Sequence, residues 1–205
     1  CGRGVRLAHD KAAALGAAKT KADVLAEGGI ITKIGSFDPS GLETVDCAGR
    51  YLTPGLINMH AHLFGTGRPS KALGGGGAQK AVLAFIRTPP GRRALDGMVS
   101  SHVLAELDSG VATLRAVGDF LGSDLRVRNA VRGGQKPGPR MFCSGTAITV
   151  PTGHGDGTFA QTASDPADLV RLVDEHHAAG ADFIKICVTG GVMDAGPGLL
   201  TLEQI

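Results

Sequence analysis

The segment "SDPADLVRLVDEHHAAGADFIKICVTGG" (164–191) most constrains the fold, because its pattern predicts a capped helix followed directly by a buried strand. Asp165 can accept hydrogen bonds at the N-cap, Pro166 suits the first turn, and Gly180 ends the helix. The apolar run that follows has the length of a strand rather than of a second helix. A helix joined to a buried strand by so short a link is typical of parallel α/β structure.

The alternation of strand and helix extends back along the chain. Further strands are predicted at 55–62, 111–118 and 140–148, and further helices at 78–86, 92–108 and 123–134. In the second of these helices, apolar residues recur every four positions, as expected for a helix with one buried face. Four strand–helix units equal half of an eight-stranded barrel or a small open sheet, and periodicity does not separate these two folds.

The first quarter of the chain follows a different rhythm. Two strands flank Gly28 and Gly29, a dipeptide that supplies the positive φ of a tight hairpin, and two shorter extended pieces follow. Residues 1–20 show no clear periodicity, and no regular element is predicted there. We therefore expect two domains, a small β domain over residues 1–54 and an α/β domain over residues 55–205.

Charge, hydropathy and cysteine content exclude several classes of protein. The 205 residues include 21 basic and 19 acidic side chains, a net charge of +2, so no nucleic-acid partner is expected. No apolar run reaches the roughly 20 residues that a membrane span needs, so no membrane partner is expected either. The four cysteines are widely spaced and form no CxxC pair, which favours a reduced, cytoplasmic protein over a disulfide scaffold.

Two histidines stand one residue apart at the end of the first α/β strand, in "TPGLINMHAHLFG" (53–65). Residues i and i+2 of a strand project to the same side, so His60 and His62 can chelate one metal ion. Pairs of this kind also occur among unrelated surface histidines. The apolar strand before the pair and the glycine-rich loop after it favour a metal site, because buried imidazoles without a partner are costly.

Lys185 interrupts the apolar strand "DFIKICV", where a buried ammonium is costly unless it is paired or neutralised. One interpretation is a lysine at a strand end that reaches out to water. The other is a lysine of lowered pKa that captures carbon dioxide, whose carbamate is an anion able to bridge two metals beside the histidine pair. Lys185 and Cys187 share one strand face, so the same inward direction would carry both.

Two further residues are candidates for substrate binding. His154 lies with Asp156 in the loop "TGHGDG", where glycines let the backbone approach a ligand; an ordinary polar turn and an anion-binding nest are the alternatives. Arg115, in the strand "TLRAVGD", is either the partner of a buried charge or a clamp for a substrate carboxylate. The remaining histidines are predicted to be structural or exposed: His9, His102, His176 and His177.

Four ordered motifs, "YLTPGLINMHAHL", "GVATLRAVG", "SGTAITVPTGHGDG" and "GADFIKICVTGGV", resemble those of the amidohydrolase superfamily. More narrowly, the chain is similar to imidazolonepropionase-like, prolidase-type metal-dependent hydrolases over residues 22 to 205. The resemblance implies a (β/α)8 TIM barrel beside a β-sandwich. Residues 55–205 would form the N-terminal half of that barrel, and residues 1–54 would form part of the sandwich.

The resemblance also implies a binuclear metal centre that holds two divalent ions, with zinc as the expected metal. By motif match, His60 and His62 would bind the more buried ion. Lys185, converted by carbon dioxide to a carbamate, would bridge both ions as a catalytic residue. His154 and Arg115 would contact the substrate, which is expected to be a dipeptide or another small molecule such as an N-acyl amino acid, hydrolysed at its amide bond.

The sequence departs from the family pattern in ways that bear on activity. The family's two later metal-binding histidines and its general-base aspartate follow the fourth barrel strand, and no residue here matches them. Asn58 and Ala116 stand where relatives often carry acidic residues. The alternative is therefore a non-catalytic half-barrel fragment that is inactive alone or needs a complementary chain. Unpaired sheet edges favour association, and we expect a homo-oligomer.

Overall fold

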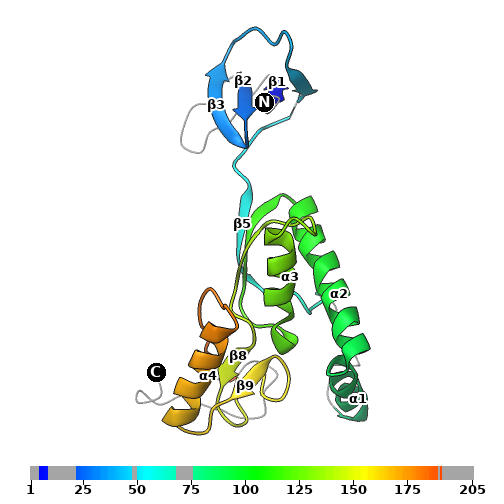
Figure 1. Cartoon of the computed structure of the whole chain (residues 1–205), viewed down its shortest axis with the longest axis vertical. Helices are drawn as coiled ribbons and strands as arrows, with labels where there is room; N and C mark the ends of the chain where they lie inside the picture. The colour runs from blue at the N-terminus through cyan, green and yellow to red at the C-terminus, as the bar shows by residue number, and fades with distance from the viewer. Residues whose placement is uncertain (1–4, 9–21, 48–49, 68–75, 189, 191–205) are drawn as a thin grey trace. The chain divides into compact units, whose positions relative to one another are not determined.

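The computed structural model describes residues 5–8, 22–47, 50–67, 76–188 and 190. The chain divides into two compact units, Cys1–Gly55 and Leu56–Ile205 (Figure 1). Each unit has its own sheet structure, and the second contains all the described helices. Within the described part of the chain, no helix combines the length and apolar character that crossing a bilayer requires.

The first unit is built around a four-stranded sheet with the strand order β3-β2-β1-β4. The strands are β1 (Val5–Ala8), β2 (Asp23–Glu27), β3 (Ile30–Gly35) and β4 (Glu43–Asp46). The predicted hairpin is confirmed, since Gly28 and Gly29 take φ values of +59° and +82° between β2 and β3. The prediction of no regular element in residues 1–20 is wrong for β1. That short strand gains its hydrogen bonds from β2 and β4, a long-range pairing that local periodicity does not reveal.

The second unit is a mixed α/β structure with two small parallel sheets, of order β5-β6-β7 and β8-β9. Its strands are β5 (Leu56–Ala61), β6 (Val111–Ala116), β7 (Arg140–Cys143), β8 (Ala147–Thr149) and β9 (Ala160–Thr162). Its helices are α1 (Gly76–Ile86), α2 (Pro89–Asp108), the 3-10 turn η1 (Phe120–Gly122), α3 (Ser123–Arg132) and α4 (Pro166–Ala178).

Helices α2 and α3 cover one face of the β5-β6-β7 sheet and form the main core with it (Figure 1). The predicted four-residue repeat of α2 is confirmed, because Leu95, Val99 and Val103 are all buried in this core. They pack with Leu114 of β6 and Met141 of β7, both almost fully buried. This packing fixes the strands whose C-terminal ends carry the candidate site.

Helix α4 begins and ends where its sequence predicts. The Asp165 side chain accepts a hydrogen bond from the backbone N–H of Asp168 at 2.8 Å, and Pro166 occupies the first turn. Gly180 follows the helix with a φ of +80°, a value that glycine adopts without strain. Leu169 and Leu172 face a second core cluster together with Ile148 of β8.

Two strand predictions need correction. The predicted strand 140–148 is divided into β7 and β8, which belong to different sheets. The left-handed Gly145, at a φ of +74°, lies between them and turns the chain from one sheet to the other. The segment around Lys185 forms a single bridge, from Ile186 to Ile148, rather than a full strand. Among the described residues its ladder partner is β8, through the bonds of the Ile148 N–H to the Lys185 carbonyl and of the Cys187 N–H to the Ile148 carbonyl.

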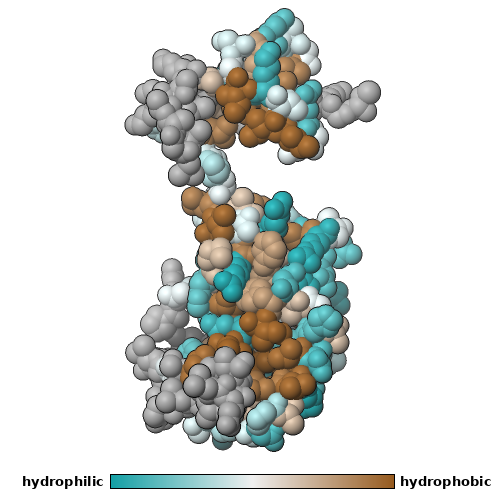
Figure 2. Space-filling model, turned by 90° about the vertical axis from the view of Figure 1, so that its left-hand side faces the viewer, coloured by the Kyte–Doolittle hydropathy of each residue, from teal (hydrophilic) through white to brown (hydrophobic). Residues whose placement is uncertain are grey.

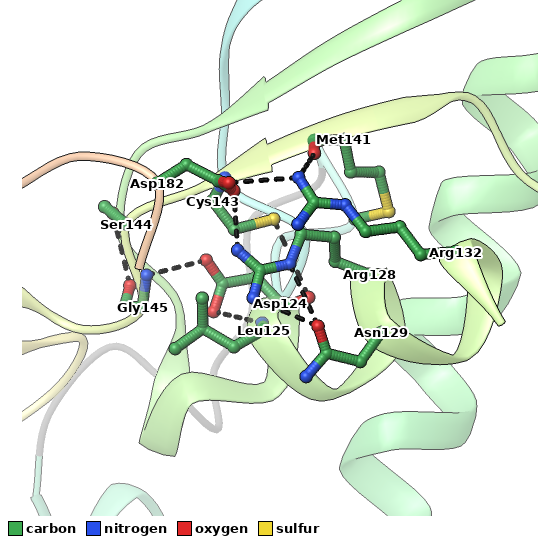
Figure 3. A network of polar contacts seen from close by, with 10 residues as sticks. All are labelled: Asp124, Leu125, Arg128, Asn129, Arg132, Met141, Cys143, Ser144, Gly145 and Asp182. Atoms are coloured by element: carbon green, nitrogen blue, oxygen red, sulfur yellow. Dashed lines mark hydrogen bonds and ion pairs between the residues drawn. The ribbon is translucent and has the colours of Figure 1, made fainter. Parts of the chain in front are cut away.

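A network of charged and polar groups joins α3 to the chain just before Lys185 (Figure 3). Asp182 binds the guanidinium groups of Arg128 and Arg132, at 2.5 and 3.0 Å, and accepts a hydrogen bond from the Cys143 N–H at 2.8 Å. The buried Asp124 accepts from the Gly145 N–H at 2.9 Å. The network anchors the entry to the Lys185 segment on both α3 and β7.

Candidate functional site

His60 and His62 lie at the C-terminal end of β5, and their side chains converge. The two Nε2 atoms are 3.3 Å apart. Two ligand nitrogens that each lie about 2.05 Å from one tetrahedral ion are separated by about 3.3 Å. The pair therefore has the spacing that a shared metal ion requires. The backbone N–H of His60 also donates to Asn58 Oδ1 at 3.1 Å, while Asn58 Nδ2 donates to Glu106 of α2.

The orientation of the His62 ring is set by the loop after β6. His62 Nδ1 lies 2.8 Å from the carbonyl oxygen of Gly118. A carbonyl only accepts, so Nδ1 carries the proton and Nε2 keeps its lone pair for another partner. Gly118 itself has a φ of +125°, and a Cβ there would lie 3.2 Å from the Ala147 Cβ and 3.3 Å from the Phe159 ring. Glycine is required at this position.

The surroundings lower the pKa of both imidazoles and so favour their neutral form. Burial lowers the pKa of His62 below its ordinary value; the bond to Gly118 opposes this shift, and the charges of His60, Lys185 and His154 reinforce it. Burial also lowers the pKa of His60, followed by the charges of Lys185 and Arg115. Neutral imidazole is the form that binds metal, so these neighbours favour the ligand state of the pair.

The segment that carries Lys185 alternates between two environments. Ile184 and Ile186 pack against the cluster under α4. Cys187 is on the other side, packed with Ala147 and Ala160 and against Phe159. Lys185 shares the side of Cys187, since alternate residues of an extended chain point the same way. It is half-buried there, and its charge acts on both imidazoles.

The structure brings the remaining predicted residues to the same region. The ring of Phe159 lies between His62 and His154, with centroids 5.1 and 5.2 Å away. Arg115 stacks its guanidinium over the Phe183 ring, 4.4 Å from the centroid, and its charge reaches His60. Five predicted residues thus lie in one region, and they come from four segments far apart in sequence: His60, His62, Arg115, His154 and Lys185.

Sequence reasoning missed two residues of this region. Phe159 separates the loop histidine from the strand histidine, but a lone aromatic residue in a loop gives no distinctive pattern. Asp119 is fully buried and accepts hydrogen bonds from the backbone just after His62. A signal for it existed, because an acidic residue directly after a buried strand of an α/β fold is unusual enough to question. His9 lies outside the described residues.

A cavity of about 370 Å³ opens elsewhere in this unit, between the α1–α2 junction and the C-terminal half of α4. Arg87, Arg92, Gln161 and His176 are among the residues that line it. None of the predicted site residues does. This cavity therefore lies away from the histidine pair, in which His60 is exposed and His62 is half-buried.

Comparison with known proteins finds relatives of part of this chain. No known protein-family profile matches the chain. The dihydroorotase of Geobacter metallireducens is 45% identical over 51 residues, which are 24% of this chain and 12% of that protein. The imidazolonepropionase of Mesorhizobium japonicum is 40% identical over 52 residues, 25% of this chain and 13% of that protein.

Solved structures match over nearly the whole chain. A Bifidobacterium longum protein described as a candidate prolidase shares 27% identity at a TM-score of 0.73, over 98% of this chain and 45% of its own. The chain resembles proteins of the amidohydrolase superfamily. A Xaa-Pro dipeptidase with bound methionine shows the same fold, with 22% identity, a TM-score of 0.78, and coverage of 98% and 52%. This chain therefore spans about half the length of the solved structures that it matches.

The donor atoms of this chain fit part of a metal site. The two Nε2 atoms supply two ligands at the correct spacing, with the His62 tautomer already fixed. Within the ranges that the structure describes, no group of three or more His, Cys, Asp or Glu side chains is arranged around one point for a metal. A site built on these residues therefore needs ligands of another kind or from another segment.

Proposed function

We propose that the protein is a metal-dependent hydrolase that cleaves amide bonds in small substrates, a dipeptide or an N-acyl amino acid. The observation that carries the proposal is the 3.3 Å separation of the His60 and His62 Nε2 atoms, beside the Lys185 side chain. The dipeptidase and prolidase names among the structural relatives support the substrate class. A cytoplasmic location remains part of the same proposal.

The architecture we propose is the N-terminal half of a (β/α)8 barrel over residues 55–205, with part of a β-sandwich over residues 1–54. The coverage of about half of each structural relative supports it. So does the order of the parallel strands, β5-β6-β7, which matches their order in the chain. In such a barrel, residues at the C-terminal ends of the strands perform the chemistry.

Each residue has a distinct role in this scheme. His60 and His62 would hold one of two divalent ions, zinc being the expected metal, through their Nε2 atoms. Lys185, carboxylated by carbon dioxide, would supply an anionic ligand to the metal centre. Bound metal would supply Lewis-acid chemistry for polarising the scissile carbonyl and activating a water. The hydrogen bond to the Gly118 carbonyl keeps the proton of His62 on Nδ1, so that Nε2 is free to bind metal.

The substrate groups would meet three other side chains. Arg115 offers a planar guanidinium, already oriented by stacking on Phe183, for a terminal carboxylate. His154 is held edge-on against Phe159 and presents an imidazole to the polar part of the substrate. Phe159 gives the site an apolar wall between the two histidines. This combination of a cationic clamp and an apolar wall suits a small carboxylate-bearing amide.

Replacing Lys185 by glutamine tests the carbamate. We expect the Zn²⁺ affinity of the wild-type chain to rise in bicarbonate buffer, because the carbamate adds an anionic ligand. The Lys185→Gln variant should lose that response and bind Zn²⁺ about 10- to 100-fold more weakly in bicarbonate. Isothermal titration with and without bicarbonate measures both effects.

The matched control is Lys80→Gln, an exposed lysine on α1. It should keep the wild-type affinity and the full response to bicarbonate. A wild-type affinity that does not change with bicarbonate would contradict the carbamate while leaving the histidine pair intact.

A second candidate is a non-catalytic half-barrel fragment that is inactive alone or needs a complementary chain. Strand β5 is at the edge of its sheet, and its apolar residues Leu56, Ile57 and Met59 are exposed by 57 to 63%. Figure 2, which views the side where β5 lies, shows hydrophobic surface on this face of the second unit. Unpaired strand edges and apolar patches promote association.

This candidate predicts a self-associating chain, the homo-oligomer expected from the sequence. Light scattering should give a mass above that of the monomer, and Ile57→Lys should shift it toward the monomer. Val170→Lys on α4 is the matched control, because Val170 is exposed to the same 63% as Ile57 but lies away from the edge. A wild-type monomer with full hydrolase activity would refute the second candidate.

A further inference from the structure

Asp119 directly follows the Gly118 turn after β6 and has no exposed surface. Its carboxylate accepts hydrogen bonds from two successive backbone N–H groups of the loop after β5, from Leu63 at 3.2 Å and from Phe64 at 2.8 Å. Its own N–H donates to the carbonyl oxygen of Gly145 at 2.9 Å. One residue therefore ties together the chain just beyond the C-terminal ends of β5, β6 and β7.

The hydrogen bonds of Asp119 fix the backbone next to His62 and next to its partner Gly118. The loop that the carboxylate holds begins one residue after His62, and the Gly118 carbonyl that binds His62 Nδ1 is one residue before Asp119. The Leu63 peptide is held from its other side as well, because His102 Nδ1 of α2 donates to its carbonyl oxygen at 2.6 Å. The backbone on both sides of the His62–Gly118 bond is therefore fixed relative to one carboxylate.

A carboxyl group is costly at this place. Burial and the nearby Asp124 raise the pKa of Asp119 well above its ordinary value, against the opposing effect of the Leu63 and Phe64 N–H groups. A neutral side chain would avoid that cost. Only a carboxylate, however, offers two acceptor oxygens at the spacing of two successive backbone N–H groups.

We propose that Asp119 is a positioning residue that holds His62 in the Nδ1–H tautomer with its Nε2 facing His60. It acts by holding the backbone of residues 62–64 in a fixed position relative to the Gly118 carbonyl. The proposal rests on the proposed function, because it concerns the imidazole pair of the metal centre. The tautomer itself is a property of the metal-free chain and can be measured there.

The test replaces Asp119 by asparagine, which keeps the shape but offers one acceptor oxygen instead of two. Side-chain ¹⁵N NMR of the metal-free chain reports the His62 tautomer. We expect a single Nδ1–H tautomer in the wild type and a mixture of both tautomers in Asp119→Asn. Titration with Zn²⁺ should show a 10- to 100-fold loss of affinity, the range typical of groups that orient a ligand.

Asp124→Asn is the matched control. Asp124 is equally buried and also accepts two backbone N–H bonds, from Gly145 and Leu125, but it has no bond to the loop after β5. This variant should lose stability while it keeps the His62 tautomer and the Zn²⁺ affinity. Asp119→Ser, which retains one oxygen acceptor without the charge, takes the place of Asp119→Asn if that variant does not fold.

The outcomes separate this inference from the proposed function. An unchanged single tautomer in the folded Asp119 variant would overturn the positioning role, whatever the metal affinity. Equal tautomer mixing in the Asp119 and Asp124 variants would overturn it too, because the effect would then come from general loosening. If the Asp119 variant shows the tautomer change but the wild-type chain binds no Zn²⁺, the positioning role is supported and the metal centre is refuted.

Discussion

Replacing His62 by alanine is expected to lower the Zn²⁺ affinity of the chain by at least about 100-fold. Loss of a group that only orients a metal ligand typically costs about 10- to 100-fold, and loss of the ligand itself should cost more. The variant removes one of the two convergent Nε2 atoms and leaves His60, the more exposed imidazole, to bind alone. It also leaves the Gly118 carbonyl without its partner. Equilibrium dialysis or isothermal titration with Zn²⁺ measures the loss.

The control for this prediction is His177→Ala on the exposed face of α4. It removes an imidazole without touching the site and should leave the affinity unchanged. If His62→Ala binds Zn²⁺ as tightly as the wild type, the 3.3 Å contact is a hydrogen bond between two imidazoles and not a chelate.

The largest effect on stability is expected from Arg128→Met, which should lower the free energy of unfolding by about 3 kcal/mol. Arg128 is only 3% exposed and binds Asp182 directly (Figure 3). Its charge also offsets the burial of Asp124, whose pKa burial raises to about 6. Without the guanidinium, two carboxylates lose their nearest buried cation. Urea unfolding followed by circular dichroism measures the change.

Arg171→Met provides the comparison. Arg171 also pairs with two carboxylates, those of Asp168 and Glu175, but on the exposed surface of α4. Surface pairs contribute little because water screens them, so no measurable change in unfolding is expected. If both variants unfold at the same urea concentration as the wild type, the network around Asp182 is not a structural anchor of the Lys185 segment.

Local sequence signals located the regular elements well wherever a helix was capped or amphipathic. Asp165 and Gly180 marked the two ends of α4, and the repeat through Leu95, Val99 and Val103 marked the buried face of α2. These signals depend only on neighbours within a few residues. Strands were harder, since pairing partners decide them. β1 exists because β2 and β4 flank it, and the Lys185 segment has one bridge, to β8, among the described residues.

The residue types of the candidate site could be predicted from the sequence, but the hydrogen bonds that orient them could not. The spacing of His60 and His62 predicts two imidazoles on one side, and the interruption of an apolar strand draws attention to Lys185. The bond from His62 to Gly118 and the bonds from Asp119 to Leu63 and Phe64 join residues about 55 positions apart. Such contacts follow from the packing of strands side by side, which no local pattern encodes.

Diffraction from crystals of the chain grown with Zn²⁺ and bicarbonate, measured at the zinc absorption edge, tests the central claim most directly. The account predicts an anomalous peak bonded to the Nε2 atoms of both His60 and His62, with the Lys185 side chain directed toward it and extended by a carbamate. A peak at any other place, or a Lys185 side chain packed under α4 with Ile184 and Ile186, would contradict the account.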